Sequence, residues 1–128
     1  MDFVTDTHSL VWFFTRDERL SQIALSAFRG TVKVGRIIVP AIVLAEIIYI
    51  CQKGRISLSF IETPNRIENS ACFEIAPLDL EILKIADNIG LDLEMHDKLI
   101  VATAIYFDMT LITKDEKITK AKVVDVVW

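Results

Sequence analysis

The sequence predicts an α/β fold of three layers, in which a mostly parallel central sheet lies between two layers of helices. Short runs rich in β-branched residues alternate with longer stretches of helical periodicity along the whole 128-residue chain. The sequence also has no repeat, no low-complexity tract and no Pro/Gly-rich linker. We therefore expect residues 1–128 to form a single domain.

The first half of the chain is expected to alternate between strand and helix. After a β-prone start and a helix, apolar residues recur with the i, i+3, i+4, i+7, i+8 spacing of an amphipathic helix. Pro40 ends the next strand, and Gly54 stops the helix that follows it. The expected elements are Asp2–Thr5, Thr7–Thr15, the stripe Leu20–Phe28, Arg36–Val39 and Ala41–Lys53.

The second half is expected to continue this alternation with shorter elements. Thr63 and Pro64 are placed as the N-cap and first residue of a helical turn, and Gly90 lies just past a later helix. The expected elements are the turns Ser57–Glu62 and Pro64–Asn69, the strand Phe73–Ala76, the helices Leu78–Ile89 and Asp97–Phe107, the strand Thr110–Thr113, the turn Glu116–Lys120 and the strand Val123–Val127. Ligands of such sheets bind at the carboxyl ends of the strands, where the strand order reverses.

Composition indicates a cytoplasmic protein. The apolar stretch Ile37–Cys51 is too short to span a membrane, and we expect no signal peptide because Asp2 and Asp6 interrupt any apolar start. Cys51 and Cys72 are far apart and are interpreted as reduced thiols. The net charge of −4 is unusual for a nucleic-acid-binding protein. This charge neither supports nor excludes binding of nucleic acid. If four of the 18 acidic residues bind a metal, as considered below, 14 acidic residues remain against 14 basic ones.

Three aspartates are expected to follow strands and to open helices: Asp6, Asp97 and Asp115. Each has an ordinary explanation as a helix N-cap, since an aspartate in that position accepts hydrogen bonds from free backbone amides. None of the three indicates a functional site by itself.

Glu46 is harder to explain as a structural residue. It lies within a predicted helix between Ile42, Val43, Tyr49 and Ile50, and no Lys or Arg is within one turn of it. Burying such a carboxylate costs on the order of several kcal/mol unless it is paired or bound to a metal. A partner must therefore come from elsewhere in the fold or be an ion, unless Glu46 lies on the one solvated face of the helix.

Together the four acids predict a metal site. Residues that follow parallel strands converge on one edge of the sheet, where four carboxylates cannot all ionise without a countercharge. Oxygen-only ligands select hard cations, so we expect Mg²⁺ or Mn²⁺ rather than Zn²⁺.

Four segments, VTDTHSLVWFF, VPAIVLAEIIYI, MHDKLIVATA and LITKDEKI, resemble in order and spacing the four motifs of PIN domains. The resemblance covers essentially the whole chain, and within the family it is greatest to VapC, the toxin half of a toxin–antitoxin pair. It implies that Asp6, Glu46, Asp97 and Asp115 are metal-binding acids. It also implies an endoribonuclease that is held silent by a cognate, VapB-like antitoxin and usually forms a homodimer.

One departure from the family pattern precedes the third acid. Many relatives carry a proline there, whereas this chain has Met95 and His96. We interpret His8 and His96 as non-catalytic, since a metal-activated water needs no histidine. Thr113 either orients an acid or a metal-bound water, or is a strand-end hydroxyl without a role.

Other residues near the acids have two readings. The aromatic run Trp12–Phe14 could stack on bases, although such runs are more often core or dimer surface. Lys98, Lys114 and Lys117 could steer phosphate or could simply be solvated. The run Trp12–Phe14 and the apolar helix Ala41–Ile50 exceed the needs of one small core. We therefore expect a dimer interface and a groove for an antitoxin helix to cover them.

The predicted activity is metal-assisted hydrolysis of RNA phosphodiester bonds. Three alternatives remain open at this point. They are a phospho-accepting receiver module, which needs adjacent acids after its first strand, a binding protein with an acidic edge, and a nuclease that acts on DNA.

Overall fold

In the computed structural model, which describes residues 1–54 and 56–128, five strands form one sheet in the order β3-β2-β1-β4-β5. Every pairing is parallel. The strand order therefore reverses at β1, which lies between β2 and β4. The strands are β1 Phe3–Thr5, β2 Ile37–Pro40, β3 Phe73–Ala76, β4 Thr110–Ile112 and β5 Val126–Val127.

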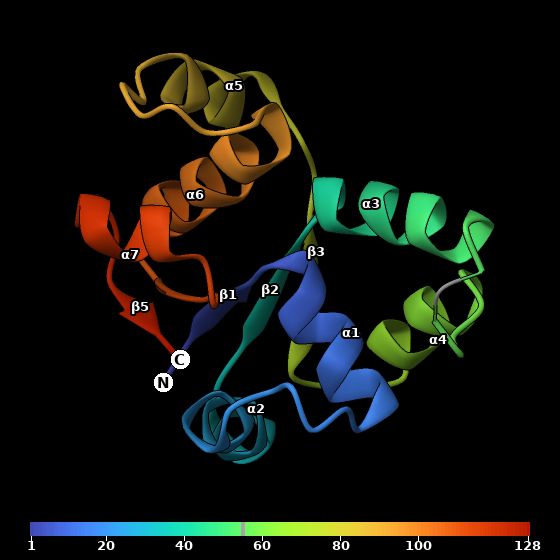
Figure 1. Cartoon of the computed structure of the whole chain (residues 1–128). Helices are drawn as coiled ribbons and strands as arrows, with labels where there is room; N and C mark the ends of the chain where they lie inside the picture. The colour runs from blue at the N-terminus through green and yellow to red at the C-terminus, as the bar shows by residue number, and fades with distance from the viewer. Residues whose placement is uncertain (55) are drawn as a thin grey trace.

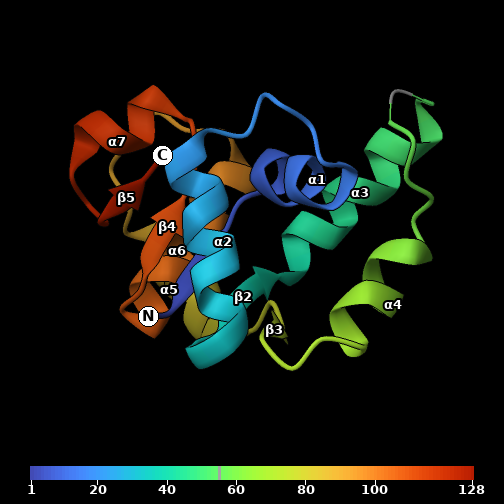
Figure 2. The same cartoon turned by 90° about the horizontal axis from the view of Figure 1, so that it is seen from below.

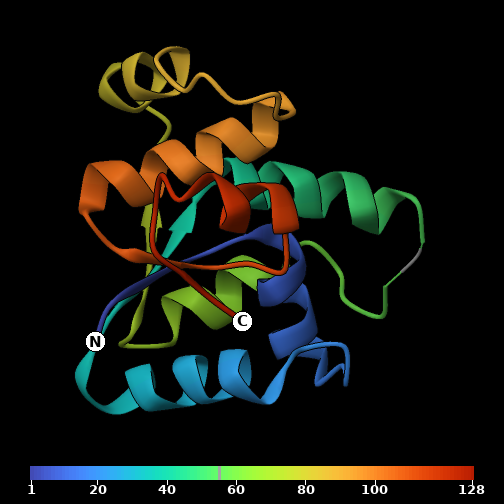
Figure 3. The same ribbon diagram turned by 60° about the vertical axis from the view of Figure 1, so that its left-hand side comes forward.

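Helices cover both faces of this sheet, as predicted (Figures 1 and 2). On one face α6 lies against β1, β2 and β4, and α5 packs against α6. On the other face lie α1, α2 and α4 (Figure 3). The helices are α1 Thr7–Thr15, α2 Gln22–Val34, α3 Ala41–Gln52, α4 Glu62–Glu68, α5 Leu80–Asp87, α6 Met95–Phe107 and α7 Glu116–Ala121. No helix in the described part of the chain is both long enough and apolar enough to cross a membrane.

The central strands are buried on both faces, which explains their continuous apolar sequences. Every residue of β1 and β2 is buried. Val4, Ile38 and Leu111 have no solvent exposure. Each such side chain contributes about 1.5–3 kcal/mol through removal of apolar surface from water. The site at the end of these strands is thus built on a rigid base.

Two residues of the aromatic run belong to the core, which corrects the expectation that the whole run is surplus surface. Phe13 stacks on Phe28, with ring centroids 4.4 Å apart, and Phe14 meets Phe73 edge-on at 5.5 Å. These contacts join α1 to α2 and β3. Trp12 is half-buried and points elsewhere.

The segment after α3 differs from the prediction. Helix α3 ends as expected near Gly54, which has a φ of +66°. Of the expected turn Ser57–Glu62, only Ser59–Glu62 forms, where the Glu62 amide donates to the Ser59 carbonyl at 3.2 Å. It leads directly into α4, whose N-cap is Ile61, so Thr63 and Pro64 lie within the first turn of that helix. Proline is tolerated throughout a first turn, because the amides there have no intrahelical acceptor. Pro64 therefore correctly predicted a helix at this point of the chain, but the helix begins two residues earlier, at Glu62.

Three further elements, α5, α6 and β5, also differ from the expected bounds. Helix α5 begins only at Leu80, because the Asp79 carboxylate accepts a hydrogen bond from the Ile82 amide at 3.1 Å and caps it. It ends at Asp87, before Gly90 is reached. Helix α6 begins at Met95, earlier than expected, and β5 is limited to Val126–Val127.

Candidate functional site

Asp6 and Asp115 follow the neighbouring strands β1 and β4 at the carboxyl edge of the sheet. Both are helix N-caps. The Asp6 carboxylate accepts from the Ser9 amide at 2.9 Å. The Asp115 carboxylate accepts from the Ile118 amide at 3.0 Å. Because a carboxylate has about four acceptor sites, capping leaves both groups with lone pairs for a cation.

Thr113 connects these two acids. Its hydroxyl donates to Asp6 Oδ2 at 2.5 Å and accepts from the Asp115 amide at 3.1 Å. Thr113 is completely buried, so the hydroxyl holds both partners without competition from solvent. Of the two readings of Thr113, contact with an acid is the one that the structure supports.

Glu46 reaches the same edge from α3, and other parts of the fold hold its carboxylate. Its Oε1 accepts a hydrogen bond from the Thr7 hydroxyl. Its Oε2 lies 3.3 Å from His96 Nε2. The Glu46 side chain is 22% exposed, so it lies neither on a solvated face nor in a sealed core. The partners that the helix itself lacks therefore come from α1 and α6.

Asp97 reaches the site from the first turn of α6 and not from the end of a strand. Helix α5 lies between β3 and α6, so the expectation that three aspartates follow three strands is wrong for Asp97. The N-cap of α6 is Glu94, so Asp97 is not the cap either. Asp97 therefore does not have the structural role of an N-cap, which was its ordinary explanation.

The surroundings of Asp97 disfavour its ionised form. Burial raises the pKa of Asp97, and the carboxylates of Asp115 and Glu46 raise it further, while His96 opposes them. A carboxyl group in this position ionises more readily when a cation is close by.

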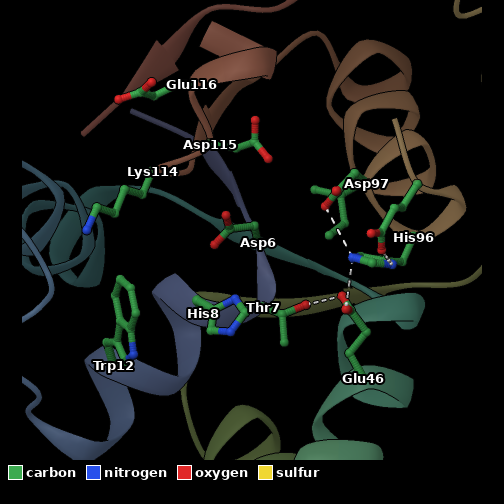
Figure 4. A pocket seen from close by; sticks show the side chains of 12 residues that line it. Asp6, Thr7, His8, Trp12, Glu46, His96, Asp97, Lys114, Asp115 and Glu116 are labelled. Carbon is green, nitrogen blue, oxygen red and sulfur yellow. Dashed lines mark hydrogen bonds and ion pairs between the residues drawn. The ribbon is translucent and has the colours of Figure 1, made fainter. Parts of the chain in front are cut away.

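The four acids line one hollow of about 600 Å³ at the edge of the sheet. Figure 4 shows Asp6, Asp97 and Asp115 around a common space, with Glu46 beside Thr7 and His96. This is the edge at which the strand order reverses, between β1 and β4. The structure thus brings the four residues together at the edge where the sequence predicted them.

This donor set fits a hard divalent cation. In residues 1–54 and 56–128, no three His, Cys, Asp or Glu side chains are close enough together to enclose an ion by themselves. The acids line an open hollow instead, which leaves room for water around an ion. That arrangement suits Mg²⁺, which usually keeps several waters and takes only a few carboxylates.

Both histidines lie at the hollow, although we assigned them no role there from the sequence. His96 Nε2 is 3.5 Å from Asp97 Oδ1 in addition to its contact with Glu46, and His96 Nδ1 is 3.5 Å from Glu94 Oε2. His8 lies on α1, where it lines the hollow together with Trp12 and Lys114. The position of His96 next to Asp97 was a signal, but its contact with Glu46 depends on the packing of α3 against α6.

The sequence matches the model of the PIN domain over residues 3–124, so the chain belongs to the PIN domain family. No curated protein matches the sequence closely enough to count as a relative.

Several solved structures with the same fold are components of toxin–antitoxin systems. VapBC2 from Rickettsia felis, bound to a DNA fragment from its promoter, has a TM-score of 0.72 at 19% identity, covering 98% of this chain and 97% of that one. A toxin–antitoxin complex from Klebsiella pneumoniae has a TM-score of 0.69 at 21% identity, covering 98% and 95%. VapC20 from Mycobacterium tuberculosis, a toxin that cleaves the sarcin–ricin loop, has a TM-score of 0.70 at 14% identity, covering 98% of both chains. The predicted PIN-like fold is therefore confirmed.

Proposed function

We propose that this PIN domain is an Mg²⁺- or Mn²⁺-dependent endoribonuclease and the toxin of a VapBC-type toxin–antitoxin pair. The observation that carries the proposal is the arrangement of Asp6, Glu46, Asp97 and Asp115. These acids come from four separate parts of the chain and line one hollow in a chain of the PIN domain family. Fold alone does not define an activity, so the proposal rests on this site.

The side chains at the hollow have different roles in the proposed hydrolysis of a phosphodiester bond. A divalent cation bound here would polarise the scissile phosphate and lower the pKa of a bound water. Asp6, Asp97 and Asp115 supply oxygen ligands, and Thr113 fixes the orientation of Asp6. Glu46 completes the ligand set or accepts the proton of the attacking water, and Thr7 and His96 hold it for either role.

The strand order argues against the receiver alternative. Receiver modules have the order 2-1-3-4-5, whereas this sheet has β3-β2-β1-β4-β5. A DNA-directed nuclease and a non-catalytic binding protein are compatible with the site chemistry. RNA is favoured by the family resemblance and by the neighbour described as a sarcin–ricin loop cleaving toxin.

A homodimer, an antitoxin partner and a cytoplasmic location complete the proposal. Several neighbours are toxin–antitoxin complexes. Helix α3 buries only Val43 and Ile47 completely and leaves Ile48 and Tyr49 exposed at 39% and 59%. Apolar surface of this kind suits a partner helix or a second copy of the chain. Sedimentation over a range of concentrations tests the dimer, and a concentration-independent monomer would contradict it.

The test of the nuclease proposal is the Asp6→Asn variant. Asparagine is as good an N-cap as aspartate, so the start of α1 is preserved while the charge is removed. We expect the wild-type protein to cleave RNA in the presence of Mg²⁺ or Mn²⁺, and we expect EDTA to abolish this cleavage. The Asp6→Asn variant should cleave at least about 10²-fold more slowly.

The matched control is Asp87→Asn, which makes the same change at an exposed residue outside the hollow. It should cleave as well as wild type. Full activity in purified Asp6→Asn would contradict the proposed site. Cleavage of single-stranded DNA but not RNA would favour the DNA alternative.

A further inference from the structure

The hollow has a second wall whose chemistry differs from that of the acids. We call it the aromatic wall and define it as His8, Trp12 and Lys114, which line the hollow, together with Arg19 and Trp128, which contact the Trp12 ring from outside it. The ring of Trp12 has His8 at 5.6 Å and Trp128 at 5.9 Å between centroids. The Arg19 guanidinium lies 5.0 Å and the Lys114 ammonium 6.0 Å from the Trp12 centroid. Figure 4 shows Trp12 and Lys114 on the side of the hollow away from Glu46.

Local structure fixes this wall. His8 and Trp12 are four residues apart on α1 and so share one helix face. The chain then turns through Arg16, which has a φ of 54°, and the Asp17 amide donates to the Trp12 carbonyl at 2.9 Å. There the Asp17 carboxylate accepts hydrogen bonds from Arg19 Nε at 3.0 Å and from its terminal nitrogen at 2.7 Å. These hydrogen bonds lower the pKa of Asp17 to about 2, so its carboxylate is ionised throughout the physiological pH range.

Beyond Trp12 lies a second hollow, of about 430 Å³, which we call the arginine hollow. Three arginines line it, Arg16, Arg29 and Arg66, against the acids Asp17 and Glu18. One of these acids is already paired with Arg19. The Arg66 guanidinium is fixed, since it donates to the Phe14 carbonyl at 2.6 Å. Trp12 lines both hollows and so lies between the acids and the arginines.

Cations beside a partly exposed aromatic ring, such as that of the half-buried Trp12, are features with which proteins hold single-stranded nucleic acid. Bases of any sequence stack on aromatic rings, and arginine and lysine contact the phosphates. In the described part of the chain Lys114 and Arg29 form no ion pair, so both are free to meet a phosphate. Although the whole chain has a net negative charge, basic residues of the aromatic wall and the arginine hollow therefore form a path that begins beside the four acids.

We propose that the aromatic wall and the arginine hollow bind the single-stranded RNA next to the cleaved bond. The base of the neighbouring nucleotide stacks on Trp12, Lys114 contacts the phosphate nearest the acids, and the next phosphate enters the arginine hollow. This inference rests on the proposed nuclease function, because the acids define where the cleaved phosphate lies. It assigns to Trp12 and Arg29 a role in holding substrate and not in the chemical step.

The chain offers a direct probe of this site, because both of its tryptophans belong to the aromatic wall. A short oligouridylate added to the full chain in EDTA should quench the intrinsic fluorescence, and its affinity is measured in parallel by anisotropy of a labelled oligonucleotide. Trp12→Leu should weaken binding about 10-fold, as expected for loss of one stacked base. Trp12→Phe should retain most of the affinity, which separates stacking from damage to the fold.

The charge contact has its own test. Arg29→Gln should weaken binding and should reduce the slope of log affinity against log salt by about 0.7, the value for one phosphate contact on a single strand. The control Lys84→Gln removes one positive charge from α5, on the opposite face of the sheet, and should change neither quantity (Figure 1). An abasic oligonucleotide should bind wild-type and Trp12→Leu equally.

The outcomes separate this inference from the function on which it rests. If wild-type cleaves RNA but Trp12→Leu and Arg29→Gln have unchanged affinity and KM, the inference is wrong and the nuclease stands. If no RNA is cleaved but both variants lose affinity for the oligonucleotide, RNA binding on this path is supported and the nuclease assignment fails. Quenching by a polyglutamate peptide and not by the oligonucleotide would indicate an acidic protein partner and would overturn the inference.

Discussion

Thr113 and Thr63 are both completely buried, yet their hydroxyls differ in what they contact. The Thr113 hydroxyl connects Asp6 to the Asp115 amide. The Thr63 hydroxyl has no hydrogen-bond partner among the described residues. A buried polar group without a partner costs roughly 1–3 kcal/mol, and removing one partner of a satisfied pair costs a similar amount.

Replacing each threonine with valine, which has almost the same shape, should therefore have opposite effects. Thr113→Val should lower the free energy of unfolding by about 1–3 kcal/mol and reduce cleavage, because Asp6 loses its donor. Thr63→Val should leave stability unchanged or raise it by about 1 kcal/mol. Urea denaturation measures both, and equal losses in the two variants would contradict this account of the hydroxyls.

Residue by residue, the sequence predicted the acids better than it predicted their partners. Glu46 stood out because a carboxylate within an apolar helix needs a reason. Its hydrogen-bond donor, Thr7, lies 39 residues away, so only the tertiary fold could identify it. Trp12 and Phe13 looked alike in sequence, but one lines the hollow and the other stacks on Phe28.

At the scale of elements, the junction between α2 and β2 depends on a glycine. A Cβ at Gly35 would lie 2.2 Å from the Met1 carbonyl oxygen and 2.9 Å from Thr31 Cγ2. Gly30, within α2, lies in an exposed part of the helix, and a Cβ there would have no neighbouring atom of the described residues within 4 Å.

We expect Gly35→Ala to lower the free energy of unfolding by about 1–3 kcal/mol, because the start of the chain must move away. Gly30→Ala should raise it by about 0.5–1 kcal/mol, since alanine is the better helix former. Chemical denaturation of the two variants checks the pair. A Gly35→Ala protein as stable as wild type would show that the chain start is not held against this junction.

The start of α6 explains where the family proline would stand. Met95 is the first residue of the helix, where proline is favoured because its amide has no intrahelical acceptor. The preceding residue, Glu94, has φ −63° and ψ 155°, which the residue before a proline prefers. The departure at Met95 therefore leaves the helix start, and the place of Asp97, unchanged.

Met95→Pro should accordingly raise the free energy of unfolding by about 0.4–1 kcal/mol, by restricting the unfolded chain. Little packing is lost, because Met95 is 64% exposed. Thermal unfolding measures the effect. A loss of more than about 1 kcal/mol would indicate that the Met95 amide donates a hydrogen bond in the folded protein.

Element types were predictable where one local signal dominated. The strand Phe73–Ala76 and the helix Thr7–Thr15 have the expected bounds, since apolar runs and flanking polar residues mark both. The start of α4 was missed because Ile61 caps it without a side-chain hydrogen bond, so no capping residue marks its first turn. The start of α6 was missed for the same reason, since the Glu94 side chain makes no cap hydrogen bond.

On the scale of the whole molecule, topology brings distant segments into one site. The sequence predicted that the acids meet at the carboxyl edge of a parallel sheet. It did not predict that β1 would lie between β2 and β4, and this strand order places Asp6 beside Asp115. It also could not predict that α5 and α6 would both precede β4, so that Asp97 comes from a helix on one face of the sheet.

Charge is also distributed on this scale. The chain has 18 acidic and 14 basic residues, and the four acids of the site equal the excess of 18 − 14 = 4. Cations bound at the hollow would therefore remove most of the repulsion between the protein and a polyanion. A bound metal is therefore expected to strengthen the binding of RNA to the acids and the basic path.

The central claim is that Asp6, Glu46, Asp97 and Asp115 form one cation site, and calorimetric titration with Mn²⁺ tests it most directly. Wild-type protein and the exposed-site control Asp87→Asn should bind Mn²⁺ with the same affinity. Asp6→Asn, Glu46→Gln, Asp97→Asn and Asp115→Asn should each weaken binding by at least about tenfold, since even outer partners of a metal site contribute that much. Absence of saturable Mn²⁺ binding by the wild type, or affinity unchanged in all four variants, would contradict the account.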